Sequence, residues 1–347
     1  MGPAHDFVTD LAALEHKAFV VDENVWRYYA DGILRPLPRS ETIAFQALED
    51  RKTLQGVQEI YDWLLERSAR RNLTLITIGG GILQDVTGFV ASTLYRGIDW
   101  IYLPTTLLAQ ADSCIGSKTS LNYRGYKNLV GSFYPPSKVW IDTSFLRTLQ
   151  KQDFYSGLGE IAKLHIMKGE EGIQQMLSAY NSICAMDTAA LQVAIQTSLE
   201  IKVGYITDDE FDHGRRNMLN YGHCIGHAIE SVSGFRIPHG QAVVIGMILA
   251  NRIAQHRGGL SETKCRFIEQ RLLTPLLRTP VERADLEPEA LIQAMGRDKK
   301  RTGKGLALVM LTDTGDMVRV TDLEAQEVRN VLREVQGSLV ETSSRWK

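Results

Sequence analysis

Three of the eight histidines in this chain lie within a span of seventeen residues, and their spacing suits metal ligands. His223 and His227 are four residues apart in a helix-like segment, so both imidazoles lie on one face of the helix. His239 opens another helix-like segment and reaches the same place if the two segments fold back on each other. With Glu160 these side chains offer three or four nitrogen and oxygen ligands, as an open catalytic zinc site requires. The spacing does not choose among the histidines, and each also suits a hydrogen-bonded position in the core.

Glu160 and Lys163 are three residues apart on a predicted helix and therefore share one face. An exposed ion pair is the usual explanation of such spacing. The adjacent Leu158 and Ile161 are apolar, which favours burial instead, and a buried carboxylate needs a metal ion or a charged partner. The residues leave both explanations open.

A group of basic and amide side chains precedes the histidines. It contains Lys202, Arg215, Arg216 and Asn220. A solvated basic face explains the group, and so does anion binding, because an arginine fork receives a carboxylate well. Near the C-terminus, Asp298, Lys299 and Lys300 are interpreted as polar surface.

A run of three glycines, Gly79 to Gly81, follows an apolar strand and precedes a helix-like segment. Such glycines let the backbone approach a pyrophosphate at the positive end of a helix. The run lacks the full GxGxxG spacing, so a tight turn also explains it. Asp85, just inside the helix, is favoured there by the helix dipole alone.

The stretch from residue 104 to residue 128 is rich in polar side chains and lies between two strands. We expect a loop beyond a strand's carboxyl end, where open α/β sheets bind ligands. Lysine and asparagine side chains there suit phosphate oxygens, although a solvated loop needs no ligand. The candidates are Thr105, Thr106, Asp112, Lys118, Lys127 and Asn128.

The elements that position these residues change character along the chain. The first half alternates helix-like stretches with short β-branched runs, which predicts an α/β fold with a parallel sheet. Strands are expected at 18–22, 73–78, 100–103 and 139–142, and an amphipathic helix at 53–71. From about residue 143 the pattern is helical, with helices expected at 183–203, 241–257 and 261–277 and a late hairpin at 307–311 and 317–320.

Length and composition narrow the class of protein. A chain of 347 residues favours two domains over one core. The net charge of -2 does not indicate the excess of basic residues that is typical of nucleic-acid-binding proteins. No apolar run approaches the roughly 20 residues that cross a bilayer. The N-terminus lacks the basic-then-apolar order of a signal peptide, and the four cysteines are scattered without a CxxC spacing. We therefore predict a cytoplasmic protein with reduced thiols.

The motifs, taken in order, resemble the 3-dehydroquinate synthase family of sugar phosphate cyclases from about residue 22 to residue 300. They are Asp22-Glu23-Asn24, Glu49 with Lys52, Gly79-Gly80-Gly81 with Asp85, Tyr95-Arg96-Gly97, Pro104-Thr105-Thr106, Asp112 with Lys118, Lys127-Asn128, Glu160 with Lys163, Arg216 to His227, and His239-Gly240. The resemblance implies a Rossmann-like NAD-binding domain over residues 1–145, a helical metal- and substrate-binding domain over residues 146–347, and a homodimer.

The resemblance also implies a role for each matched residue. It assigns a zinc or cobalt ion to Glu160, His223 and His239, and it moves His227 to the substrate phosphate. The implied NAD contacts are Asp22, Asn24, Glu49, Lys52, Gly79, Gly80, Gly81, Asp85, Thr105 and Thr106. The implied phosphate contacts are Lys118, Asn128, Asn220, His227, Lys300 and Arg96, the last across a dimer interface. Asp112, Lys127, Lys163, Lys202 and Arg216 would line the rest of the substrate.

The implied activity is that of a carbon–oxygen lyase acting on a linear sugar phosphate. NAD⁺ oxidises a hydroxyl, phosphate is eliminated, the ketone is reduced again, and an intramolecular aldol step closes a carbocycle, so NAD⁺ ends unchanged. Arg216 favours the seven-carbon keto acid phosphate of the shikimate route as substrate. The alternatives are a cyclase that makes 2-deoxy-scyllo-inosose or a valiolone, an NAD-dependent metal polyol or alcohol dehydrogenase, and an inactive relative that serves as a binding protein.

The chain departs from the family pattern at several positions. Ser117 stands where these synthases have the second glycine of Gly-Gly-Lys, and Gln241 replaces the glutamate of His-Gly-Glu. Leu164 and His165 replace small residues after the lysine. The first nucleotide strand also comes so early that an edge hairpin is expected to be missing.

Overall fold

The computed structural model describes residues 4–296 and 306–344, which fall into two compact units that divide between Leu149 and Gln150. Asp298, Lys299 and Lys300 lie outside the described residues. No helix within the described ranges has the length and apolar character needed to span a membrane.

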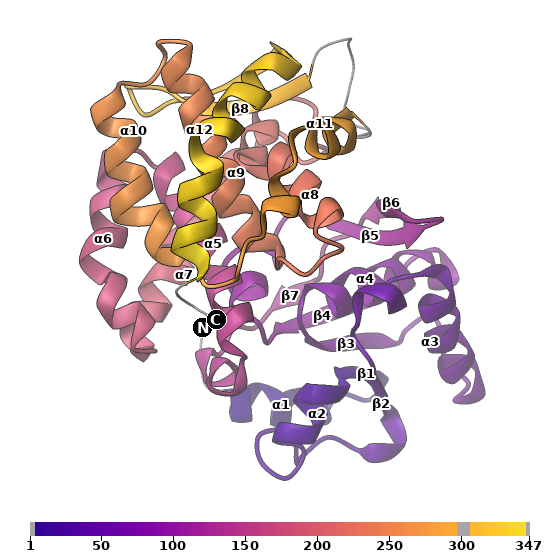
Figure 1. Ribbon diagram of the computed structural model, residues 1–347. Coiled ribbons are helices and arrows are strands. Elements are labelled where there is room, and N and C mark those ends of the chain that lie inside the picture. Colours follow the sequence, from indigo (N-terminus) through magenta and orange to yellow (C-terminus); the bar gives the residue numbers. More distant parts are fainter. Residues whose placement is uncertain (1–3, 297–305, 345–347) are drawn as a thin grey trace. The chain divides into compact units, whose positions relative to one another are not determined.

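A five-stranded parallel sheet forms the centre of the first unit (Figure 1). Its order is β2-β1-β3-β4-β7. The strands are β1 (Lys17–Asp22), β2 (Thr42–Phe45), β3 (Thr74–Gly79), β4 (Asp99–Pro104) and β7 (Lys138–Val139). Because Gly79 pairs with Pro104, β3 and β4 end at the same edge. The predicted α/β class is confirmed, whereas β2 was not predicted and β7 is shorter than the expected 139–142.

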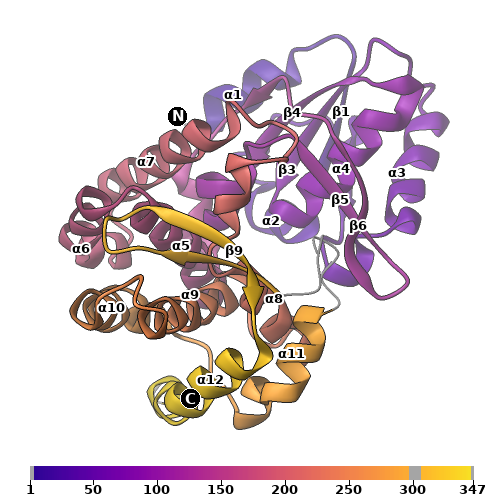
Figure 2. The ribbon, with the colours of Figure 1, turned by 90° about the horizontal axis from the view of Figure 1, so that it is seen from above.

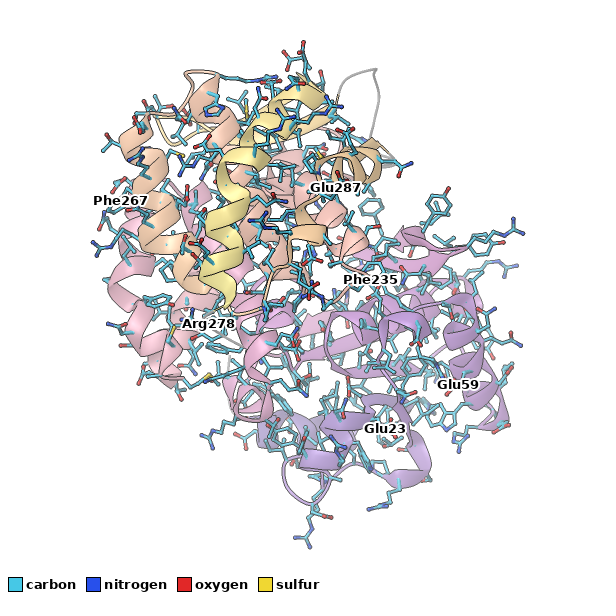
Figure 3. All side chains as sticks on the ribbon, viewed as in Figure 1. Glu23, Glu59, Phe235, Phe267, Arg278 and Glu287 are labelled. Atoms are coloured by element: carbon cyan, nitrogen blue, oxygen red, sulfur yellow. The ribbon has the colours of Figure 1, made fainter. Side chains whose placement is uncertain are left out.

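Helices cover both faces of this sheet. They are α1 (Ala4–Ala12), α2 (Glu23–Tyr29), α3 (Leu54–Glu66) and α4 (Gly81–Thr93). Single 3-10 turns occupy Arg39–Glu41, Glu49–Arg51, Leu94–Arg96 and Thr143–Thr148, and a π-helical turn occupies Ala109–Ser113. Thr53 caps α3 by accepting a hydrogen bond from the Gly56 amide, and Glu59 projects outward from the helix (Figure 3). This helix ends at Glu66, five residues before the predicted end.

The prediction of a loop throughout 104–128 is wrong beyond residue 117. An antiparallel hairpin is formed there by β5 (Lys118–Tyr123) and β6 (Tyr126–Phe133). Its turn residues Arg124 and Gly125 have φ values of 48° and 78°, the positive pair that a two-residue hairpin turn requires. The many polar side chains concealed the strand pattern, because both strands are only partly buried.

The second unit is mostly helical, as predicted. Its helices are α5 (Lys151–Met167), α6 (Glu170–Cys184), α7 (Thr188–Ile206), α8 (His223–Val232), α9 (His239–His256), α10 (Glu262–Ile268), α11 (Pro288–Gly296) and α12 (Ala325–Ser344). Short 3-10 turns occupy Arg215–Asn220, Thr274–Leu276 and Arg283–Leu286, and a π-helical turn occupies Glu269–Leu273. The helix predicted at 183–203 begins five residues later, at Thr188, because Asp187 caps α7. The helix predicted at 261–277 is regular only as far as the end of α10, where a π-helical turn follows. Strands β8 (Leu306–Leu311) and β9 (Met317–Leu323) form the predicted hairpin.

Helix α9 is the centre of the second unit, and α5, α8 and α12 pack around it (Figures 1 and 2). Fourteen of its residues are buried, which explains its apolar sequence. The amino-terminal ends of α8 and α9 are histidines, so this packing determines where the imidazoles lie.

Candidate metal centre and nucleotide edge

Glu160, His223 and His239 meet in the second unit, from three different helices. Their ligand atoms lie within 4.8 Å of one another. Glu160 Oε1 is 3.1 Å from His239 Nε2 and 3.5 Å from His223 Nε2, and the carboxylate is fully buried. One carboxylate and two imidazoles at this spacing are three ligands of the kind that a divalent zinc or cobalt ion binds.

Glycines bring the helices that carry these ligands into close contact. A Cβ on Gly159 of α5 would lie 2.4 Å from the Gly240 carbonyl oxygen, and one on Gly240 of α9 would lie 1.8 Å from the Ser156 oxygen. Gly222, before α8, has a φ of 77°, and a side chain there would meet Met247. The small residues beside each ligand therefore set the distances between the ligands.

Hydrogen bonds orient both imidazoles so that Nε2 faces Glu160. The Nδ1–H group of His223 donates to the Tyr221 carbonyl oxygen at 3.1 Å. His239 Nδ1 donates to Glu230 Oε2 at 3.0 Å. A carbonyl and a carboxylate only accept, so each Nδ1 carries a proton and each Nε2 is the nitrogen that faces an ion.

The charges around Glu160 keep it ionised. Burial alone would raise the pKa of Glu160, but Lys163, whose Nζ is 2.5 Å from Oε2, and the two imidazoles hold it well below its usual value. Burial and Lys163 lower the pKa of His223, which leaves that ring neutral. Burial also opposes the charge on His239, but Glu230 and Glu160 raise its pKa to about 10, so binding an ion there displaces a proton.

This cluster passes a simple test of fit for a divalent cation. Both Glu160 oxygens are buried, and neither accepts a hydrogen bond of regular geometry from the described residues. Lys163 compensates the charge at Oε2, whereas Oε1 faces the two imidazoles, so an ion bound among these three side chains would satisfy it. The interpretation of Glu160 and Lys163 as an exposed ion pair is therefore wrong, because their side chains are 0% and 2% exposed.

His227 lies one turn after His223 on α8 and is exposed. Its ring lies 5.7 Å from that of His239, and it forms a second possible ligand set with Glu230 and His239. The sequence analysis did not single out Glu230. The available signal was a carboxylate among the apolar residues of a helix that carries two histidines.

Three further candidates of the second unit are also partly or fully buried. Arg216 is 4% exposed, and its guanidinium donates to the Glu210 carbonyl oxygen. Lys202 is buried, and Asn220 donates to the Asn217 carbonyl oxygen at 3.0 Å. A solvated basic face therefore does not describe the group, although Arg215 is exposed and stacks on Tyr205.

In the first unit, the candidate NAD residues gather at the carboxyl edge of the sheet. Asp22 ends β1 and caps α2 by accepting from the Asn24 amide, and the Thr105 amide donates to the Gly79 carbonyl oxygen. A Cβ on Gly80 would lie 2.9 Å from Thr106 Cγ2. No side-chain hydrogen bond from a described residue caps α4, which leaves the start of this helix suited to binding an anion.

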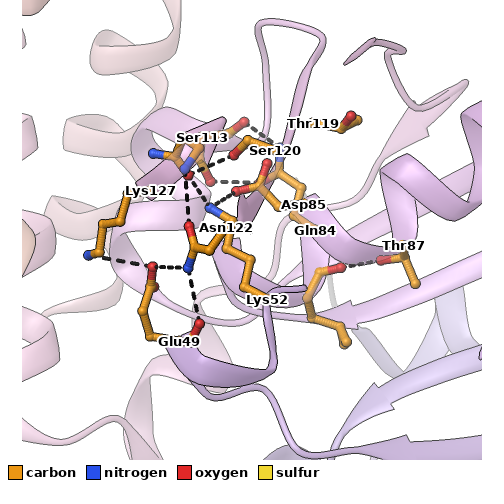
Figure 4. Close-up of polar contacts among 12 residues, drawn as sticks. Glu49, Lys52, Gln84, Asp85, Thr87, Ser113, Thr119, Ser120, Asn122 and Lys127 are labelled. Atoms are coloured by element: carbon orange, nitrogen blue, oxygen red, sulfur yellow. Dashed lines mark hydrogen bonds and ion pairs between the residues drawn. The ribbon is translucent and has the colours of Figure 1, made fainter. Parts of the chain in front are cut away.

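A partly buried network joins two groups of candidates that the sequence analysis kept apart (Figure 4). Lys52 Nζ lies 2.6 Å from Asp85 Oδ2 and donates to Asn128 Oδ1 at 2.7 Å. Glu49 accepts from Asn122 and lies 3.5 Å from Lys127. A predicted NAD contact therefore holds a predicted phosphate contact in place.

The remaining candidates of the first unit occupy turns and edges. Lys118 is exposed at the start of β5, and Asp112 lies in the π-helical turn. Arg96 is exposed with a φ of 66°, directly after Tyr95 at 52°, an uncommon pair of left-handed residues.

The departures from the family pattern have local explanations. Ser117 has a φ of 65°, a conformation that glycine adopts without strain. Gln241 is buried, and its amide donates to the Tyr155 and Leu276 carbonyl oxygens and accepts from the Arg278 amide. His165 is a buried, hydrogen-bonded core histidine whose pKa is lowered by burial. Residues 4–12 form α1, and no strand lies among residues 4–16.

Comparison with solved structures supports the fold. The chain superposes on a 2-epi-5-epi-valiolone synthase from Streptomyces hygroscopicus, described with NAD⁺ and Zn²⁺, with a TM-score of 0.86, 26% identity and coverage of 94% and 92% of the two chains. A 2-deoxy-scyllo-inosose synthase superposes with a TM-score of 0.79 at 22% identity, covering 95% of this chain and 94% of its own. Glycerol dehydrogenase from Schizosaccharomyces pombe superposes with a TM-score of 0.64 at 16% identity, covering 99% of this chain and 87% of its own. The last two likenesses concern the fold alone.

Comparison with known sequences identifies the family. A 3-dehydroquinate synthase from Clostridium tetani is 37% identical over 91% of this chain and 84% of its own length. One from a Sulfurovum species is 36% identical over 91% and 89%. The sequence profile of the 3-dehydroquinate synthase N-terminal domain matches residues 42–156, and that of the C-terminal domain matches residues 157–301. The chain is therefore a member of the 3-dehydroquinate synthase family.

Proposed function

We propose that this protein is an NAD- and divalent-metal-dependent sugar phosphate cyclase and, within that class, a 3-dehydroquinate synthase, a carbon–oxygen lyase. The observation that supports this most strongly is the meeting of Glu160, His223 and His239 in a chain of this family. The NAD⁺ and Zn²⁺ named with the Streptomyces valiolone synthase support the same pair of cofactors.

When bound, the ion would supply Lewis acidity toward a substrate oxygen, and NAD⁺ would supply a reversible hydride acceptor. Asp22, the glycine turn and Thr105 would hold the nucleotide at the carboxyl edge of the sheet, with its pyrophosphate at the start of α4. Lys163 would keep Glu160 ionised and ready to bind the ion. His227 and Asn220 would receive the substrate phosphate, together with Lys118.

Arg216 is the residue on which we base the substrate. A buried guanidinium binds a carboxylate through charge-assisted hydrogen bonds, which neutral sugar phosphates cannot accept in the same way. Because Arg216 already donates to Glu210, a neutral substrate would not leave it wholly unpaired. The expected preference is therefore about 1.5–3 kcal/mol, equivalent to roughly 10- to 150-fold. This is less than the 10² to 10³ or more that a fully desolvated, unpaired guanidinium would give.

The substrate experiment compares kcat/KM for 3-deoxy-arabino-heptulosonate 7-phosphate, sedoheptulose 7-phosphate and glucose 6-phosphate. Arg216→Ala should lose the acid substrate far more than either neutral one. The matched control is Arg215→Ala, since Arg215 is exposed and stacked on Tyr205. Equal or better turnover of a neutral sugar phosphate by the wild type would favour a related cyclase, the second candidate, which the fold of the valiolone synthase supports.

The ion experiment tests the ligand set. Purified protein should carry about one divalent ion per chain, whereas His223→Ala and His239→Ala should bind the ion so much more weakly that they are purified without it. His227→Ala should keep the ion and lose activity, since we assign it to the phosphate. Loss of the ion in His227→Ala with retention in His239→Ala would favour the second ligand set instead.

We further propose a cytoplasmic homodimer. The four cysteines are free, which suits a reducing compartment. The exposed Arg96 is held in a strained turn, and none of the described residues pairs with its guanidinium, which supports a role on a partner subunit. Sedimentation velocity would measure the oligomeric state.

A further inference from the structure

The carboxylate of Glu230 lies where a negative charge is unfavourable unless another group compensates it. It lies in the last turns of α8, where the helix dipole disfavours a negative charge, and it is only 5% exposed. A carboxylate that is both buried and at the negative end of a helix needs a strong compensating contact.

Its contact with His239 provides compensation with a defined geometry. Glu230 Oε2 lies 3.0 Å from His239 Nδ1, while Glu160 Oε1 lies 3.1 Å from Nε2 of the same ring. The ring therefore lies between two carboxylates, one on each nitrogen. His239 also belongs to two possible ligand sets, the first with Glu160 and His223 and the second with His227 and Glu230.

We infer that Glu230 is a positioning residue that holds the proton on His239 Nδ1 and thereby commits Nε2 to the ion. This inference rests on the proposed metal site and extends it from three ligands to the carboxylate behind one of them. A carboxylate behind a ligating imidazole fixes the ring's orientation and makes its other nitrogen a better donor of electrons. It also disfavours an ion in the second set, because the nitrogen that faces Glu230 carries the proton.

The two ligating histidines differ in this respect. His223 is oriented by the neutral Tyr221 carbonyl oxygen, whereas His239 is oriented by a full negative charge. The side chain of His239 is also the more exposed, at 32% against 14%. The more exposed ring has more freedom to rotate, so it gains more from an anchored hydrogen bond.

The test substitutes Glu230→Gln, which keeps the size and removes the charge. A glutamine either accepts the Nδ1 proton more weakly or donates its own N–H, in which case the proton moves to Nε2 and the ion loses a ligand. We expect Zn²⁺ affinity, measured by competition with a chelator, to fall about 10- to 100-fold. The Co²⁺-loaded protein should show a changed visible absorption spectrum, a readout that reports the ligands directly.

Four controls separate this role from a structural one. Glu269→Gln removes a carboxylate that is paired with Arg252 in the same unit, and it should leave ion affinity unchanged. In a His239→Ala background, Glu230→Gln should have no further effect on residual ion binding, because the effect passes through His239. Thermal unfolding of each ion-free variant checks that the variant is folded. If Glu230→Gln fails to fold, Glu230→Asp replaces it: this variant keeps the charge on a shorter side chain and should bind the ion with an affinity below that of the wild type.

Wild-type affinity and cobalt spectrum in a folded Glu230→Gln would overturn the inference, and so would an equal effect in the His239→Ala background. Absence of ion binding by the wild type would instead contradict the proposed metal site. The two failures are therefore distinguishable.

Discussion

Replacing Gly159 with alanine should damage the metal centre without touching a ligand. The added Cβ would lie 2.4 Å from the Gly240 carbonyl oxygen, and ordinary contact begins near 3.4 Å. Helices α5 and α9 must therefore separate by about 1 Å, since 3.4 minus 2.4 is 1.0. Glu160 follows this glycine on α5 and His239 precedes Gly240 on α9, so the separation moves two ligands apart.

Gly204→Ala is the matched control, because Gly204 also lies in a helix but nothing lies within 4 Å of the added Cβ. Alanine favours the helix by about 1 kcal/mol at both positions, so the difference between the variants isolates the packing cost. Overpacking costs about 1–3 kcal/mol. For a unit of this size that difference corresponds to roughly 2–12 °C in Tm.

The assay combines thermal unfolding of the ion-free variants with Zn²⁺ affinity from chelator competition. Gly204→Ala should unfold at or above the wild-type Tm and bind Zn²⁺ normally. Gly159→Ala should unfold several degrees below Gly204→Ala and bind Zn²⁺ at least about 10-fold more weakly, since metal ligands tolerate displacements of only about 0.2 Å. Equal Tm and equal affinity in the two variants would refute the packing argument.

Three further changes test particular contacts. Lys163→Met should lower the Tm of the ion-free protein, because it leaves the buried Glu160 charge with less compensation, and should increase the Tm gained on adding Zn²⁺; an unchanged gain would contradict this. Ser117→Gly should raise stability by about 0.5–1 kcal/mol in urea titrations, because glycine tolerates a φ of 65°, and a loss of stability would show that the serine side chain compensates. Gln241→Glu should destabilise by about 2–4 kcal/mol at pH 8, since a carboxylate would face two carbonyl oxygens. Burial raises the pKa of that new carboxyl group, so stability should return as the pH falls through it and protonation restores a donor. A Tm deficit that is the same at pH 5 and pH 8 would count against this reasoning.

The parts of the site that sequence reasoning found share a local signal. The histidine spacing, the apolar neighbours of Glu160 and the glycine run after β3 each depend on residues within one or two turns. Packing then placed Glu160, His223 and His239 together, a step that required knowledge of how α5, α8 and α9 meet.

The parts that it missed depend on contacts that are distant in the sequence. Lys52 meets Asn128 across 76 positions, and no pattern near either residue indicates the pair. Glu230 and His239 are only nine positions apart but belong to different helices. The β5–β6 hairpin was hidden because its polar side chains lack the apolar alternation by which strands are predicted.

The most direct test of the central claim uses 3-deoxy-arabino-heptulosonate 7-phosphate with NAD⁺ and Zn²⁺ or Co²⁺. Released phosphate and NADH absorbance are followed together in the same reaction. A cyclase should release one phosphate per substrate consumed, with no lasting rise in NADH absorbance. Removal of the ion should stop both substrate consumption and phosphate release. Steady accumulation of NADH without phosphate release would contradict the cyclase account and favour a dehydrogenase.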